Sequence, residues 1–183
     1  MTIRIGLMYG TTTMNSERVA ELIWDRMQET ELHDIKDGVD VLEQYTKIIL
    51  VAPTWDYGDL QEDYIEAWDK LKTINWSNKS VALVGLGDQV GYGDLYQDSM
   101  NTLYETISKL GGTFVGFTSK DGHSFLQSKA IRNDKFVIMK NFEIFVFESS
   151  PDSMFFDLGT AKSRACVPSL SLIQFLQKFV QMF

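Results

Sequence analysis

The length, composition and charge of the chain limit its possible functions. Its 183 residues correspond to one domain, and a hydrophobic content of 44% predicts a folded core. Asp and Glu number 25 against 17 Lys and Arg, so the formal net charge is −8. This charge repels nucleic acids and anionic membranes and attracts basic protein surfaces. We therefore expect no nucleic-acid or membrane partner.

The cysteine content and the termini indicate the compartment. Cys166 is the one cysteine in the sequence and cannot form an internal disulfide. The N-terminus enters an apolar run at residues 3–7 without a signal peptide. No segment reaches the roughly 20 apolar residues of a membrane span, and the apolar spacing at 169–183 predicts an amphipathic helix. These features predict a cytoplasmic protein.

Strand and helix signals alternate along the chain. In chain order, strands are predicted at 3–8, 31–35, 48–52, 81–85 and 113–117, of which the second is short and polar like an edge strand. Between them lie apolar residues at helical spacing: Val19, Leu22, Ile23 and Met27, then Tyr64, Ala67, Trp68 and Leu71, then Met100, Leu103, Tyr104 and Ile107. This order is typical of a single α/β domain with a doubly wound parallel sheet and helices on both faces.

Ligands of such folds bind beyond the carboxyl ends of the strands, which directs attention to loops 9–16, 53–62 and 86–94. The first loop runs from Gly10 through three threonines into a helix, and offers hydroxyl and backbone N–H donors to an anion. It matches neither a Walker loop nor a GxGxxG fingerprint, so its donors are neutral. The alternative is that Ser and Thr only cap the helix.

The second and third loops carry exposed aromatic residues and glycines. Trp55 and Tyr57 follow one strand, and Tyr92 lies among the closely spaced glycines that follow the next. Glycines allow the backbone to approach a ligand, and aromatic rings at one sheet edge favour a flat aromatic ligand. Packing of these rings against neighbouring loops is the alternative for each one taken singly.

The three loops together resemble those of bacterial and algal flavodoxins. The shared motifs are the TxT phosphate loop, Pro-Thr-Trp, and Gly-x-Gly-Asp-Gln-x-Gly-Tyr, and the segment 112–135 resembles the loop that interrupts strand five in the long-chain branch of the family. The similarity covers residues 3–136. It implies a monomer with a flavodoxin-like five-stranded parallel sheet in the order 2-1-3-4-5, and a non-covalently bound FMN.

The resemblance also implies roles for individual residues. The first loop would hold the phosphate, Trp55 and Tyr92 would stack on the isoalloxazine ring, and the Asp56–Tyr57 peptide would accept from flavin N5. Asp88 would lie near the pyrimidine side, and Gln97 near the ring or ribitol. The full predicted set is Thr11, Thr12, Thr13, Met14, Asn15, Ser16, Thr54, Trp55, Asp56, Tyr57, Gly58, Leu86, Gly87, Asp88, Tyr92 and Gln97.

These features together predict a low-potential one-electron carrier and not an enzyme. Acidic residues crowd the predicted ring site and would disfavour an anionic reduced flavin: Asp56, Asp59, Glu62, Asp63, Glu66, Asp69, Asp88, Asp94 and Asp98. The same acidic surface would attract basic partners, for which the family suggests a ferredoxin/flavodoxin–NADP reductase and low-potential acceptor enzymes. A merely solvated charged face is the alternative. His33 and His123 are far apart in the sequence and suggest neither a metal site nor a catalytic site.

Two segments depart from the family. Met14 stands where many flavodoxins have Gly, which predicts a strained loop and weaker FMN binding. After Val137 the resemblance ends, so residues 138–183 are an atypical tail that can leave apolar surface exposed. Two other functions stay open: a small NAD(P)H-dependent flavin or quinone reductase, and a flavodoxin-like binding module without FMN.

Overall fold

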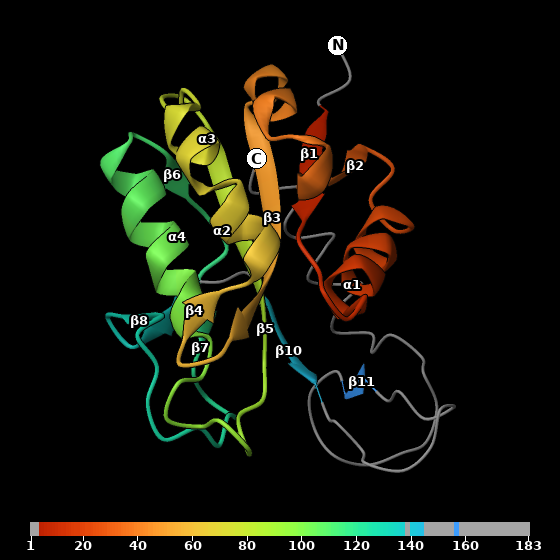
Figure 1. Cartoon of the computed structure of the whole chain (residues 1–183). Coiled ribbons are helices and arrows are strands. Elements are labelled where there is room, and N and C mark those ends of the chain that lie inside the picture. Colours follow the sequence, from red (N-terminus) through yellow and green to blue (C-terminus); the bar gives the residue numbers. More distant parts are fainter. Residues whose placement is uncertain (1–3, 138–139, 145–155, 158–183) are drawn as a thin grey trace.

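The computed structural model describes residues 4–137, 140–144 and 156–157 (Figure 1). Its helices are α1 (Asn15–Trp24), η1 (Ile35–Asp37), η2 (Asp40–Gln44), α2 (Glu62–Glu66), α3 (Trp68–Thr73) and α4 (Asp98–Lys109), of which η1 and η2 are 3₁₀ helices. Its strands are β1 (Ile5–Tyr9), β2 (Thr30–Asp34), β3 (Lys47–Trp55), β4 (Asp59–Leu60), β5 (Ser80–Gly87), β6 (Thr113–Phe114), β7 (Thr118–Ser119), β8 (Ile131–Arg132), β9 (Lys135–Phe136), β10 (Lys140–Ile144) and β11 (Phe156–Asp157). The helix predicted at 169–183 lies outside the described residues.

The main sheet has the expected parallel topology. Its strands follow the order β2-β1-β3-β5-β10, all paired in parallel, which confirms the predicted order 2-1-3-4-5. The short strands β4 and β11 pair antiparallel with β3 and β10. Parallel neighbours place their carboxyl ends at one edge, so the loops after β1, β3 and β5 lie together there.

The fifth position of the sheet is filled by two separate strands, as the resemblance implied. β6 pairs with the start of β5 at Ser80 and Val81, and β10 pairs with its end. The chain between them forms a small sheet of β7, β9 and β8. The predicted strand 113–117 is shorter than expected, because only one further backbone bond, from Val115, follows β6 before Gly116 adopts a φ of 84°. We call residues 115–137 the insertion.

Two hydrophobic cores cover the two faces of the sheet. Alternate residues of β3 point to opposite sides, since side chains alternate along a strand. Ile49 and Val51 pack in the core that contains Val19 and Ile23 of α1. Leu50 and its neighbours on the other face pack in the core that contains residues of α2, α3 and α4, and Figure 1 shows these helices opposite α1. The predicted doubly wound arrangement is therefore confirmed.

The helix predicted from Tyr64 to Leu71 is divided at Ala67 into α2 and α3. The Ala67 N–H still donates to the Asp63 carbonyl, and the Ala67 carbonyl accepts from the Leu71 N–H. Helical hydrogen bonds therefore connect α2 to α3 across Ala67. Among the helices in the described ranges, none is long and apolar enough to cross a membrane.

Candidate functional site

A cleft of about 560 Å³ opens where the carboxyl ends of β1, β3 and β5 meet. This volume is in the range of cofactor and ligand sites. The lining comes from all three predicted loops and from the segment before α4: Thr11, Thr12, Thr13, Asn15, Ser16, Pro53, Thr54, Trp55, Asp56, Gly87, Asp88, Tyr92, Leu95, Tyr96 and Gln97. None of these residues is Lys or Arg, so any anion in the cleft meets neutral donors.

A buried carboxylate fixes the backbone of the first loop by a hydrogen bond. The Thr11 N–H donates to Oδ2 of Asp63 at 2.9 Å, and Nζ of Lys36 lies 3.3 Å from Oδ1 of the same side chain. The hydrogen bond to Asp63 raises the pKa of Lys36 above its usual value. Gln61 Nε2 adds a bond of 3.0 Å to the Thr12 hydroxyl. The loop is thus fixed by η1 and by the start of α2.

Polar atoms at the end of this loop are buried and unpartnered. Asn15 and Ser16 begin α1 and are both buried. Asn15 Oδ1 and Ser16 Oγ make no hydrogen bond to any residue of the described ranges. A buried polar atom without a partner is costly, and a helix N-terminus favours an anion. This end of the cleft is therefore suited to a phosphate group.

Aromatic residues line the other part of the cleft. Trp55 and Tyr92 belong to its lining, and Tyr92 keeps 62% of its surface exposed. Asp88 also lines it, and its Oδ1 accepts from the Val90 and Gly91 amides at 2.8 and 2.9 Å. Asp88 therefore shapes the third loop in addition to facing the cleft.

Gln97 lies beneath the cleft in an unusual conformation. It is fully buried, its φ of 62° is left-handed, and neither amide atom has a hydrogen-bond partner within the described part of the chain. A Cβ added to Gly85 would lie 1.7 Å from Gln97 Oε1, so glycine is needed there to leave room for the amide. This buried, unpartnered amide is therefore a candidate to hydrogen-bond a ligand.

Comparison with known proteins decides the family. The flavodoxin family model matches residues 7–133. A flavodoxin of a Synechocystis species is 46% identical over 138 residues, which cover 73% of this chain and 81% of that protein. Flavodoxin 2 of Escherichia coli is 40% identical over 135 residues, 72% of this chain and 78% of that one. This chain belongs to the flavodoxin family.

Solved flavodoxin structures agree with this assignment. The Fusobacterium nucleatum flavodoxin bound to flavin mononucleotide superposes with a TM-score of 0.71 at 32% identity, over 74% of this chain and 82% of that one. Oxidised Flavodoxin 1 of Bacillus cereus shares the fold over 98% of this chain and 99% of its own, with a TM-score of 0.64 and 22% identity. Flavodoxins are electron-transfer flavoproteins, so the prediction of a carrier in place of an enzyme is confirmed.

Most residues predicted from the flavodoxin motifs lie in the lining, but four do not. Met14 and Tyr57 are exposed, at 66% and 85%. Leu86 is buried in the core on the α1 side of the sheet, and Gly58 packs against Asp98. The structure adds Pro53, Leu95 and Tyr96 to the lining. Tyr96 is buried and stacks on Phe125 of the insertion, with ring centroids 5.4 Å apart.

The acidic surface expected around the site is smaller than predicted. Asp63 and Asp98 are buried, at 6% and 3% exposed, and are paired with Lys36 and Lys129. Lys72 also pairs with the exposed Asp69, at 2.7 Å, so three of the nine predicted acidic residues have a lysine partner, and two of these three are buried. Asp56, Asp59 and Asp94 are exposed, as expected.

Met14 has a left-handed backbone conformation, with φ 64° and ψ 0°. This left-handed conformation costs a residue with a Cβ about 1–2 kcal/mol. We expect Met14→Gly to be more stable than Met14→Ala by about 1 kcal/mol, because both remove the long side chain and only glycine relieves the backbone. Urea unfolding of the two apoproteins measures the difference. Equal midpoints would show that the backbone at position 14 is not strained.

Proposed function

We propose that this flavodoxin binds one FMN in the cleft and acts as a low-potential one-electron carrier. The observation that carries the proposal is that Asn15, Ser16 and Gln97, which have buried, unpartnered polar atoms, line the same cleft as Trp55 and Tyr92. This set of groups suits a ligand that has a phosphate at one end, a flat aromatic ring at the other, and a polar linker between them. That FMN accompanies a related flavodoxin of F. nucleatum supports the same assignment.

Each part of the cleft has a role in this proposal. Hydroxyls of Thr11, Thr12, Thr13 and Ser16, with the start of α1, bind the phosphate. Trp55 and Tyr92 stack on the ring, and backbone groups at 54–58 and 86–88 meet its polar edges, as does the Gln97 amide. FMN supplies the one-electron chemistry, and the protein sets which charge state of the cofactor is favoured.

The electrostatics of the cleft favour a low potential. Asp56 and Asp88 line it, and no Lys or Arg does. Added negative charge on a reduced cofactor is therefore disfavoured by the carboxylates and by the electron-rich faces of the aromatic rings. The exposed Asp56, Asp59 and Asp94 attract basic partner proteins. We infer that a ferredoxin/flavodoxin–NADP reductase and low-potential acceptors are the partners, in the cytoplasm, with this chain as a monomer.

Titration of the apoprotein with FMN tests the proposal. We expect saturation at one FMN per chain with strong quenching of flavin fluorescence, because the ring stacks on Trp55 and Tyr92. Reduction should then proceed in two separate one-electron steps. A folded protein that does not quench FMN would contradict the proposal and favour a binding module, and steady oxidation of NADPH by the purified protein would favour a reductase. The expectation that Met14 weakens FMN binding stays a prediction.

A further inference from the structure

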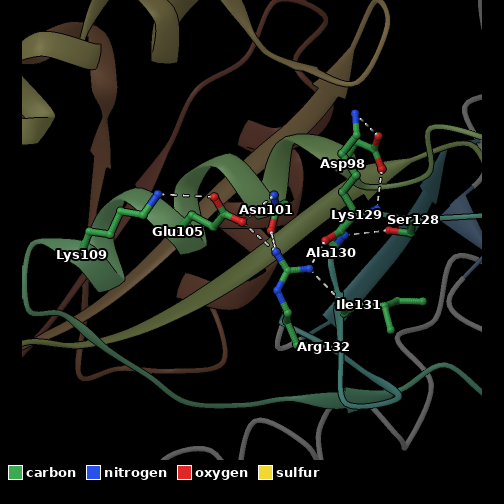
Figure 2. A network of polar contacts seen from close by, with 9 residues as sticks. All are labelled: Asp98, Asn101, Glu105, Lys109, Ser128, Lys129, Ala130, Ile131 and Arg132. Atoms are coloured by element: carbon green, nitrogen blue, oxygen red, sulfur yellow. Dashed lines mark hydrogen bonds and ion pairs between the residues drawn. The ribbon is translucent and has the colours of Figure 1, made fainter.

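Charged contacts attach the insertion to helix α4 (Figure 2). The Lys129 N–H donates to Asp98 Oδ1 at 2.7 Å, and Lys129 Nζ lies 2.9 Å from Oδ2 of the same carboxylate. One and two turns further along α4, Arg132 donates to the Asn101 side-chain carbonyl and to Glu105 Oε1. The residues 129–132 thus follow the helix from its first turn.

The Lys129–Asp98 pair differs from an ordinary surface ion pair. Asp98 has only 3% of its side chain exposed, whereas Lys129 reaches it from the surface with 66% exposed. Lys129 satisfies both carboxylate oxygens, one with its backbone and one with its ammonium group. Removal of one partner from a buried ion pair is strongly destabilising, because it leaves an uncompensated buried charge. Asp98 therefore depends on Lys129 for its position.

Asp98 also contacts the second loop of the cleft. A Cβ added to Gly58 would lie 2.8 Å from Asp98 Cβ, so the backbone of Gly58 lies directly against the Asp98 side chain. On the far side, Ser99 Oγ lies 2.7 Å from the Thr54 hydroxyl and donates to the Pro53 carbonyl at 3.3 Å. The start of α4 is thus fixed between the insertion and the end of β3.

Gln97 immediately precedes these two anchored residues. Its left-handed backbone is unfavourable for a residue other than glycine and is maintained only by its surroundings. Gln97 belongs to the lining of the cleft, and its fully buried amide lies against the backbone of Gly85 without a hydrogen-bond partner in the described residues. Asp98 follows Gln97 directly in the chain and begins α4, so the anchoring of Asp98 restricts the backbone on one side of Gln97.

We propose that Lys129 is a positioning residue for the cofactor, which acts through Asp98 to hold Gln97 in its left-handed conformation and direct its amide into the cleft. This inference rests on the proposed function. Lys129 itself is not part of the cleft lining. The insertion thereby contributes to FMN affinity from outside the site.

FMN titrations of four proteins test the inference: the wild type, Lys129→Met, Lys129→Arg and Lys120→Met. We expect Lys129→Met to weaken FMN binding about tenfold. A loss of this size lies within the range of interaction energies measured between contacting residues. Lys129→Arg keeps the positive charge and should retain most of the affinity. Lys120→Met removes the same charge from the insertion and breaks the Lys120–Asp134 pair, which does not involve α4. It should bind FMN like the wild type. Equal affinities of Lys129→Met and the wild type would overturn the inference.

A double-mutant cycle separates positioning from general loss of stability. In a Gln97→Ala background, Lys129→Met should no longer change the affinity, because the group through which it acts is gone. A tenfold loss that persists there would contradict the route through Gln97. The NMR signal of the Gln97 side-chain amide in the apoprotein gives a second measurement, which should shift in Lys129→Met and stay in place in Lys120→Met. If Lys129→Met does not fold, the same measurements are made on Lys129→Gln.

The two proposals can fail separately. If the folded wild type binds no FMN, the proposed function is wrong, and the apoprotein amide signal still measures the coupling. If the wild type binds FMN and neither affinity nor the amide signal responds to Lys129, only the positioning role is wrong.

Discussion

Trp55→Ala is expected to weaken FMN binding about 10- to 100-fold, because stacking of a flat heterocycle on one aromatic side chain contributes about 1–3 kcal/mol. Trp55 lies at the carboxyl end of β3 and lines the cleft. The variant should also lose much of the quenching of flavin fluorescence, since Tyr92 alone would still face the ring. Titration of the apoprotein with FMN measures both quantities.

Trp24→Ala is the matched control for this substitution. Trp24 ends α1, is 47% exposed, and does not belong to the lining of the cleft. Its removal should leave affinity and quenching at the wild-type level. If Trp55→Ala and Trp24→Ala gave the same dissociation constant, the ring would not stack on Trp55.

Trp76→Ala is expected to lower the free energy of unfolding by about 3–5 kcal/mol, the usual loss when a buried Trp is truncated to Ala. Trp76 precedes β5, has no exposed surface, and packs in the core beneath α3 and α4. Its Nε1 donates to the Leu71 carbonyl at 3.0 Å, so the variant loses a buried hydrogen bond in addition to the packing. Urea unfolding of the apoprotein measures the effect.

The half-exposed Trp24 again provides the comparison, since Trp24→Ala should cost less than about 1 kcal/mol at a surface position. Trp76 is absent from the lining of the cleft, so the folded fraction of Trp76→Ala should bind FMN normally. A loss below about 1 kcal/mol in Trp76→Ala would mean that the surrounding side chains refill its space.

The sheet could be predicted from the sequence because buried parallel strands leave a local pattern. The run around Ile48 and Val51 is apolar at every position, and both faces of β3 are covered. The second strand is polar and half-buried, which matches its place at the edge beside β1. The interruption of strand five is predicted by the family resemblance alone, because the apolar periodicity of the sequence does not indicate it.

The site could be predicted in part. Residues at the carboxyl end of a strand or in the loop after it, such as Thr11, Trp55 and Tyr92, lie where the sheet topology places them. The sequence places Asp63 and Asp98 in the acidic surface, because it reveals their charge and not their burial. Their lysine partners lie 27 and 31 residues away, too far for any local pattern. Contacts of this kind depend on the tertiary structure.

The interruption of the fifth strand makes this part of the sheet more costly to form. β6 and β10 pair with positions only three residues apart on β5, yet about 25 residues of chain separate them, and closing a flexible loop of that length costs about 3 kcal/mol of chain entropy. Contacts of Tyr96 with Phe125 and of α4 with Lys129 and Arg132 offset this cost. The return of the chain from the insertion to β10 thus depends on side-chain contacts with α4, in addition to the backbone pairing of β10 with β5 and β11.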